Sequence, residues 1–175
     1  SVRTAEIRDS YEEYLRKYGR SRRLAEAAPG EIKWMADWAL KRYKPVFHRW
    51  LTQSFPEPAR WFATRQNVAR STAVWSMVGY ILGLGDRHGE NILFDISNGE
   101  CVHVDFSCLF EKGLALAQPE VVPFRLTPNM VDILGVTGTE GAFREVSEVT
   151  MKLLREKQDL LMTNLETFLH DPLVE

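Results

Sequence analysis

Apolar residues recur at helical spacing in three stretches of the first half of the chain, residues 4–18, 31–54 and 58–82. Because residues three or four apart share one face of a helix, these stretches predict helices. Pro45 interrupts the second stretch and predicts its division into two helices, since proline lacks the N–H donor that a helix interior needs. The third helix is expected to end at Gly83 and to be almost wholly buried; its apolar side chains are Val74, Trp75, Met77, Val78, Ile81 and Leu82.

The pattern changes after residue 90. Residues 91–95 and 101–105 are short β-type runs joined by a turn that contains Asn98-Gly99, which predicts a hairpin. Residues 106–128 show no steady period, and a loop of that length in a compact domain is usually functional. Residues 139–156 and 158–169 predict two final helices, with Phe143, Val146, Val149 and Leu153 on the first and Leu161, Leu165 and Phe168 on the second. The predicted fold is mainly α with a small β-hairpin.

Composition narrows the class of function. The chain has 175 residues, 45% of them apolar, and a net charge of -2. This charge argues against direct nucleic-acid binding driven by bulk electrostatics. No apolar run approaches the length of a membrane-spanning helix, so no membrane partner is expected. The two cysteines, Cys101 and Cys108, have no metal-ligand spacing and fit a reducing, intracellular protein.

Three polar residues around the predicted hairpin have the order that phosphoryl transfer requires. Asp86 and Asn91 lie five apart on a loop that leads into the first strand, and Asp105 follows the second strand. Because the strands pair, Asp105 is expected to emerge beside Asn91. A carboxylate that orients the attacking hydroxyl, together with an Asp and an Asn that hold Mg²⁺, is the donor set of protein kinases. Phe106 follows Asp105, as in the Asp-Phe-Gly motif.

The order Asp86-Arg87-His88 differs from the His-Arg-Asp of ordinary protein kinases. Within Gly-Leu-Gly-Asp-Arg-His-x-x-Asn it resembles the phosphatidylinositol 3-kinase superfamily, and more closely the phosphatidylinositol 3-kinase-related protein kinases. Among these the chain is most similar to the ATR-type checkpoint kinases. The resemblance is densest in residues 70–95, 99–106, 122–127 and 168–175.

The resemblance implies a role for each matching residue. Asp86 and His88 would be catalytic, the first orienting the substrate hydroxyl and the second donating a hydrogen bond to the γ-phosphate. Asn91 and Asp105 would hold Mg²⁺ or Mn²⁺. Leu93 and Val104 would touch the adenine of ATP. Arg87 is expected to brace the loop, and His103 is read with equal weight as a structural histidine and as a functional one.

The resemblance also implies a domain organisation, that of the C-terminal lobe of a protein-kinase-like (PI3/PI4-kinase catalytic) fold. Residues 1–82 would form a helical segment leading into the lobe and 83–91 the catalytic loop. Residues 91–105 would form the hairpin, 105–128 the activation loop and 129–175 the C-terminal helices. The N-lobe and a FATC-like C-terminal segment would lie outside this chain, in the same polypeptide.

Partners and location are implied in the same way. Substrates would be proteins with Ser/Thr-Gln sites, and the end of the activation loop, residues 123–127, would help to form the site for the residue after the phosphoacceptor. The parent would carry an ATRIP-type regulatory subunit and act in the nucleus, in DNA-damage and replication-stress checkpoint signalling.

Two other functions remain open. A lipid (phosphoinositide) kinase shares the Asp-Arg-His order, but residues 106–128 are neutral, whereas a polyanionic head group favours a basic loop. A non-catalytic scaffold is expected to have lost a metal or base residue, whereas Asp86, Asn91 and Asp105 are all present here. The scaffold role stays open for the lobe isolated from its N-lobe, because a C-lobe alone cannot clamp ATP and would be inactive. One departure from the kinase motif is Ser107, which stands where Asp-Phe-Gly has glycine and is expected to reduce the freedom of the loop to flip.

Overall fold

The computed structural model describes residues 29–116, 120 and 122–169. The helix predicted at residues 4–18 lies outside this part of the chain. The chain falls into two units, residues 1–45 and 46–175, and each is described by itself. In the first unit, helix α2 spans Pro29–Arg42. Trp38 packs edge-on against Tyr43, with ring centroids 6.2 Å apart.

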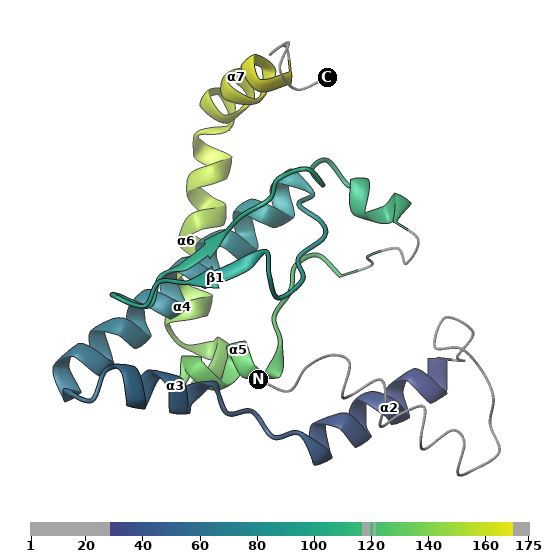
Figure 1. Cartoon of the computed structure of the whole chain (residues 1–175). Helices are drawn as coiled ribbons and strands as arrows, with labels where there is room; N and C mark the ends of the chain where they lie inside the picture. The colour runs from purple at the N-terminus through teal and green to yellow at the C-terminus, as the bar shows by residue number, and fades with distance from the viewer. Residues whose placement is uncertain (1–28, 117–119, 121, 170–175) are drawn as a thin grey trace. The chain divides into compact units, whose positions relative to one another are not determined.

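The second unit is mainly helical and has a two-stranded antiparallel sheet, as predicted (Figure 1). Helix α4 packs against α6, α5 and strand β2, and helices α3 and α5 lie side by side. The elements in chain order are α3 Phe47–Ser54, α4 Pro58–Leu82, β1 Ile92–Phe94, β2 Cys101–His103, the 3₁₀ helix η2 Lys112–Ala115, α5 Pro128–Leu134, the 3₁₀ helix η3 Gly138–Glu140, α6 Ala142–Glu156 and α7 Gln158–Leu169. The gap between α2 and α3 contains Pro45, so the predicted division there is confirmed.

Helix α4 begins and ends where local chemistry dictates. The Glu57 carboxylate accepts hydrogen bonds from the backbone N–H groups of Ala59 and Arg60, at 3.1 and 2.8 Å, and Pro58 occupies the first turn. At the other end Gly83 adopts a left-handed conformation with φ 58°. The N–H of Leu84 then reaches the carbonyl of Gly79 at 2.9 Å, which closes the helix. The predicted end at Gly83 is confirmed.

The prediction that α4 is almost wholly buried is wrong. Its buried face consists of small side chains, whereas Val74 and Ile81 are 40% and 44% exposed. Small residues let the hairpin and α6 approach the helix axis closely, so the surface of contact follows steric fit and not apolar character alone. The buried residues are Thr64, Val68, Ala69, Thr72, Ala73, Ser76 and Gly79.

Within the described residues, the buried apolar side chains form three clusters around α4. Larger aromatic residues pack against the edges of these clusters. Trp50, Trp61 and Trp75 are among them, and each is half-buried. The first cluster is Leu51, Phe55, Val68 and Ile133; the second is Ala69, Ala73, Leu134 and Phe143; the third is Ile92, Cys101 and Met130.

The two strands of the hairpin pair as predicted, but each is shorter than expected. Ile92 faces His103, and Phe94 faces Cys101. The turn contains Gly99, whose φ of 79° favours glycine and whose hydrogen lies where a Cβ would collide with Thr64 of α4. The Asn-Gly signal therefore identifies both the turn and its point of contact with α4.

Helix α5 was not predicted, although its signal is present. The Thr127 hydroxyl accepts from the N–H of Met130 at 3.3 Å, and Pro128 follows in the first turn. Two side chains of this helix cap α3. The Asn129 side chain accepts from the N–H of Val46 at 2.8 Å, and the Asp132 carboxylate accepts from the N–H of His48 at 2.9 Å.

The apolar stripe predicted on the first C-terminal helix is only partly buried. Phe143 of α6 is buried, and Thr150 is the other fully buried residue of this helix. Val149 and Leu153, assigned to the same face from their spacing, are exposed. In α7, Leu161 and Leu165 are half-buried. Among the described helices, none combines the length and the apolar character required to cross a membrane.

Candidate active site

The loop that follows α4, residues 83–91, holds Asp86 in an unusual backbone conformation. Its φ of 56° lies in the left-handed region. The Asp86 carbonyl accepts hydrogen bonds from the side-chain amide of Asn91 at 2.8 Å and from the N–H of His88 at 3.0 Å. Its N–H donates to the Glu120 carboxylate at 2.7 Å. Three bonds thus fix the backbone of Asp86, while its carboxylate remains open to solvent.

Arg87 joins this loop to the end of the hairpin. Arg87 is 6% exposed, and its side chain donates to four backbone carbonyls. Its guanidinium binds the carbonyls of Gly85 at 2.9 Å, Val104 at 2.7 Å and Asn91 at 3.4 Å, and that of Asp105. A guanidinium presents several donors in a rigid plane, so one side chain satisfies both segments. The prediction that Arg87 braces the loop is confirmed.

The bracing brings the two predicted metal ligands to the same end of the hairpin. The N–H of Val104 donates to the Asn91 carbonyl at 3.0 Å, which continues the ladder beyond β1 and β2. Because the Nδ2 group of Asn91 is bonded to Asp86, its Oδ1 is oriented away from that carbonyl. Asp105 follows with φ 59° and an exposed side chain.

Ser107 orients the Asp105 carboxylate. Oδ1 of Asp105 accepts from the Ser107 hydroxyl at 2.6 Å and from the Ser107 N–H at 3.0 Å, so Oδ2 is left for another ligand. These bonds, with a smaller contribution from the Arg87 charge, lower the pKa of Asp105 and keep it ionised. A glycine at position 107 has no hydroxyl to make the shorter of these bonds, which is a physical reason for the restricted loop that the sequence predicts.

The tautomer of His88 follows from its backbone neighbour. The N–H of Glu90 donates to Nδ1 of His88 at 3.2 Å, so Nδ1 accepts and a neutral ring carries its proton on Nε2. Nε2 lies 3.9 Å from Oδ2 of Asp86. The side chains of Asp86 and His88 are 44% and 48% exposed, so both groups are accessible to a substrate.

The two faces of the hairpin differ. His103 stacks on Trp75 of α4 with ring centroids 4.8 Å apart, and Phe106 also stacks on Trp75 at 5.8 Å. Burial, and then the charge of Arg87, lowers the pKa of His103 to about 4, so it is a neutral ring in the core. This favours the structural role for His103. Leu93, exposed on the opposite face, lies across from Val102.

Val104, two residues after Val102, shares its face because side chains alternate along a strand. Leu93 and Val104 are therefore on one face of the hairpin, away from α4, where the adenine contact was predicted. The assignment of Leu93 and Val104 to the adenine contact stays a prediction.

The donor set at the end of the hairpin fits a hard cation. Within the described residues no group of three or more His, Cys, Asp or Glu side chains is arranged to hold a metal. Asn91 and Asp105 offer one amide oxygen and one carboxylate. Mg²⁺ keeps several waters and is commonly bound by one or two protein oxygens plus substrate phosphates, so two ligands suffice.

A family model described as phosphatidylinositol 3- and 4-kinase matches residues 4–175. The chain belongs to this family. The predicted fold, a lobe of the PI3/PI4-kinase type, is thereby confirmed, and so is the resemblance to ATR-type kinases. Protein kinase rad3 of Schizosaccharomyces pombe is 60% identical over 152 residues, which are 87% of this chain and 6% of that protein. The serine/threonine-protein kinase ATR of Arabidopsis thaliana is 63% identical over 136 residues, 78% of this chain and 5% of that protein.

Solved structures agree with the sequence comparison. The FAT and kinase domain of CtTel1 superimposes with a TM-score of 0.82 at 43% identity, and the match covers 86% of this chain and 11% of that one. This kinase-family chain therefore spans only a small part of the proteins it resembles.

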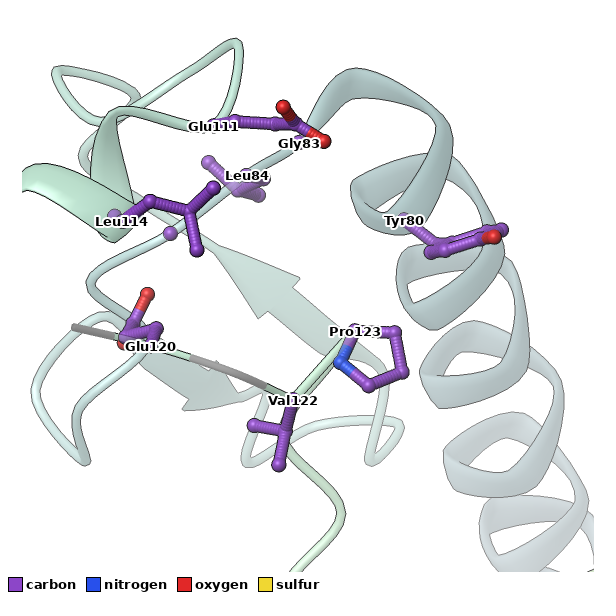
Figure 2. Close-up of a pocket in the computed structure, with 10 residues that line it drawn as sticks. Tyr80, Gly83, Leu84, Glu111, Leu114, Glu120, Val122 and Pro123 are labelled. Carbon is purple, nitrogen blue, oxygen red and sulfur yellow. The ribbon is translucent and has the colours of Figure 1, made fainter.

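Sequence reasoning missed Glu120. In the printed sequence it is one acidic residue in a loop of neutral net charge, and no spacing links it to Asp86. The structure places it beside Gly85 and Gly113, at the edge of a cavity of about 230 Å³ (Figure 2). The two glycines leave room for its carboxylate, but nothing in their positions along the sequence links them to Glu120. The cavity is lined by Tyr80, Gly83, Leu84, Gly85, Glu111, Gly113, Leu114, Glu120, Val122 and Pro123.

Replacing Arg87 with alanine is expected to loosen the 83–91 loop. Four carbonyls would lose a charged donor, and hydrogen bonds to charged groups contribute about 1.5–3 kcal/mol each without being additive. Backbone amides of the loop should then exchange with deuterium roughly 100-fold faster in the full-length parent, since about 2.7 kcal/mol of local opening energy is lost. Arg125→Ala, which removes an exposed arginine, is the matched control. Unchanged protection in Arg87→Ala would contradict the bracing role.

Proposed function

We propose that this chain is the catalytic lobe of a serine/threonine protein kinase that transfers the γ-phosphate of ATP to a protein hydroxyl. The observation that supports it most directly is the set of Arg87 hydrogen bonds, which ties the backbone of Asn91 and Asp105 to the loop of Asp86. The N-lobe and a FATC-like segment are supplied by the rest of the same polypeptide. The boundaries expected from the sequence, including the 83–91 catalytic loop and the 105–128 activation loop, belong to this proposal.

The residues divide the chemistry between them. Asp86 accepts the proton of the substrate hydroxyl as its oxygen bonds to the γ-phosphorus, and the bond from that phosphorus to the bridging oxygen of ADP breaks. The Nε2–H of His88 donates a hydrogen bond to the transferring phosphoryl group, whose oxygens carry the charge. Asn91 and Asp105 hold Mg²⁺, or Mn²⁺, which neutralises phosphate charge when bound. Leu93 and Val104 form an apolar floor for adenine.

The cavity beside Gly85 supports a preference for glutamine after the phosphoacceptor. Its lining includes the apolar residues Leu114, Val122 and Pro123 and the acidic residues Glu111 and Glu120. A glutamine side chain has an apolar stem and an amide that donates to a carboxylate. A glutamate at the same place would meet two like charges. Ser/Thr-Gln specificity is therefore compatible with this chain's own residues.

The relatives are named as ATR-type and Rad3 kinases, and their names support the rest of the proposal. The parent protein would act in the nucleus in DNA-damage and replication-stress checkpoint signalling, with an ATRIP-type regulatory subunit. Neither nucleic acid nor membrane is proposed as a direct partner of this lobe, whose parent acts on proteins.

The test is a phosphate-transfer assay of the purified full-length parent with Mg²⁺ and ATP. Peptides containing Ser-Gln and Ser-Glu are compared with phosphoinositide vesicles. We expect transfer to Ser-Gln with a kcat/KM roughly 10–100-fold above that for Ser-Glu, the equivalent of one hydrogen bond to a charged group. Preferential phosphorylation of the vesicles would favour the lipid-kinase alternative, and no transfer to either would favour a scaffold.

A further inference from the structure

Glu120 makes a contact that the proposed chemistry leaves unused. Its carboxylate accepts the N–H of Asp86, 34 residues earlier in the chain, at 2.7 Å. The other backbone bonds of Asp86 come from within its own loop, from Asn91 and His88. Glu120 is therefore the link between the backbone of Asp86 and the 105–128 loop.

Two glycines leave room for the Glu120 carboxylate. An added Cβ at Gly85 would lie 2.7 Å from Oε2 of Glu120, and an added Cβ at Gly113 would lie at the same distance. Both glycines are buried. The N–H of Glu120 also donates to the carbonyl of Gly113 at 3.1 Å. The carboxylate thus occupies a slot between two segments that meet through their glycines.

The two segments are also paired through their backbones. The N–H of Gly85 donates to the carbonyl of Cys108 at 2.7 Å, that of Phe110 to Leu82 at 2.9 Å, and that of Glu111 to Gly83 at 3.0 Å. Residues 108–111 therefore run beside residues 82–85. Glu120 adds a contact to the next residue, Asp86, whose side chain carries the proposed chemistry.

The backbone conformation of Asp86 explains why the contact with Glu120 matters. A non-glycine residue with positive φ is held at a cost of about 1–3 kcal/mol and persists only where its surroundings fix it. In this conformation the N–H of Asp86 points out of its own loop and needs an external acceptor. A charged acceptor is about twice as strong as a neutral one.

We propose that Glu120 is a positioning residue, which holds the backbone of Asp86 in the geometry for phosphate transfer. This inference rests on the kinase function proposed above. Loss of the carboxylate would leave the N–H of Asp86 without this acceptor and would relax its backbone. The enzyme would then bind nucleotide normally and transfer phosphate slowly.

The experiment uses the full-length parent, with turnover expressed per nucleotide-binding site. Glu120→Ala should lower kcat roughly 10–100-fold, the range for a misplaced catalytic group, on a peptide with Ala after the serine, which places no amide in the cavity, and by at least as much on a peptide with Gln. The KM for ATP should stay within about twofold, because Glu120 is not among the groups proposed to bind nucleotide. Glu120→Gln, which keeps an acceptor oxygen, should restore most of the lost rate.

Two further variants separate this role from the cavity and from general stability. Glu111→Ala removes the other acidic residue of the cavity and should lower the preference for glutamine over alanine after the serine. Gly113→Ala should lower kcat when Glu120 is present and have little further effect in Glu120→Ala, because its Cβ then meets no atom closer than 3.4 Å.

Each outcome decides one question. A wild-type kcat in Glu120→Ala, a loss explained by fewer nucleotide-binding sites, or additive effects of Gly113→Ala and Glu120→Ala would overturn the positioning role. A parent protein that does not phosphorylate any peptide would overturn the proposed function instead, and the wild-type assay shows this before any variant is made.

Discussion

Replacing Asp86 or Asp105 with asparagine in the full-length parent is expected to abolish phosphate transfer to a Ser-Gln peptide, with kcat at least about 10³-fold lower. Both residues have positive φ, and asparagine tolerates this conformation nearly as well as aspartate. The backbone should therefore persist, and the loss should be chemical. The measurement is steady-state turnover, with alanine variants of both residues as the harsher form of the same test.

The two variants should differ in how they bind nucleotide. Asp105→Asn removes the charge of a proposed metal ligand and should weaken Mg²⁺-dependent ATP binding, whereas Asp86→Asn should leave that binding close to wild type. Asp95 provides the control at the other end of the hairpin. Its carboxylate accepts from the hydroxyl and N–H of Ser97 at 2.5 and 2.6 Å, the same arrangement as Asp105 with Ser107. The Asp95→Asn variant should keep the phosphate-transfer activity of the wild type. Full activity in either Asp86→Asn or Asp105→Asn would refute the assignment.

The second large effect is expected at His88. Alanine at this position should reduce kcat by about 10²–10³-fold, as does the removal of one donor to a developing oxyanion. The donor is Nε2–H, since Nδ1 is occupied as an acceptor by the N–H of Glu90. Glutamine carries an N–H group on a side chain of similar reach, so His88→Gln should retain more activity than His88→Ala.

The kinetic signature matters as much as the size of the effect. A donor that acts on the transferring phosphoryl group lowers kcat and kcat/KM together. If His88→Ala changed only the KM for ATP, the side chain would bind the ground state and would not serve the transition state. The matched comparison is Glu90→Ala, which keeps the N–H that orients the ring and should leave kcat unchanged.

Several elements were predictable because their signals are local. Glu57 and Pro58 at one end and Gly83 at the other determine the bounds of α4, since caps act within one turn of the helix. The turn of the hairpin follows from Asn98-Gly99, and the five-residue spacing of Asp86 and Asn91 places both on one loop. The role of Arg87 as a brace followed from the same run of residues.

Other features required contacts that are distant in sequence. A helical period shows that Val74 and Ile81 lie near one another on α4, but it does not show which face meets the hairpin and α6. The structure buries the small residues there because they permit the closest approach. Helix α5 had its own cap at Thr127, yet its part in capping α3 depends on pairs of residues 83 and 84 apart in the chain.

The sequence by itself determined the helical class, the hairpin, and the identity and order of Asp86, His88, Asn91 and Asp105. These follow from local backbone preferences and from side-chain chemistry, which act over a few residues. Only the tertiary structure decided that Arg87 joins the two segments through carbonyls and that Glu120 holds the N–H of Asp86. Backbone carbonyls and N–H groups are the same at every position, so sequence spacing carries no record of which of them meet.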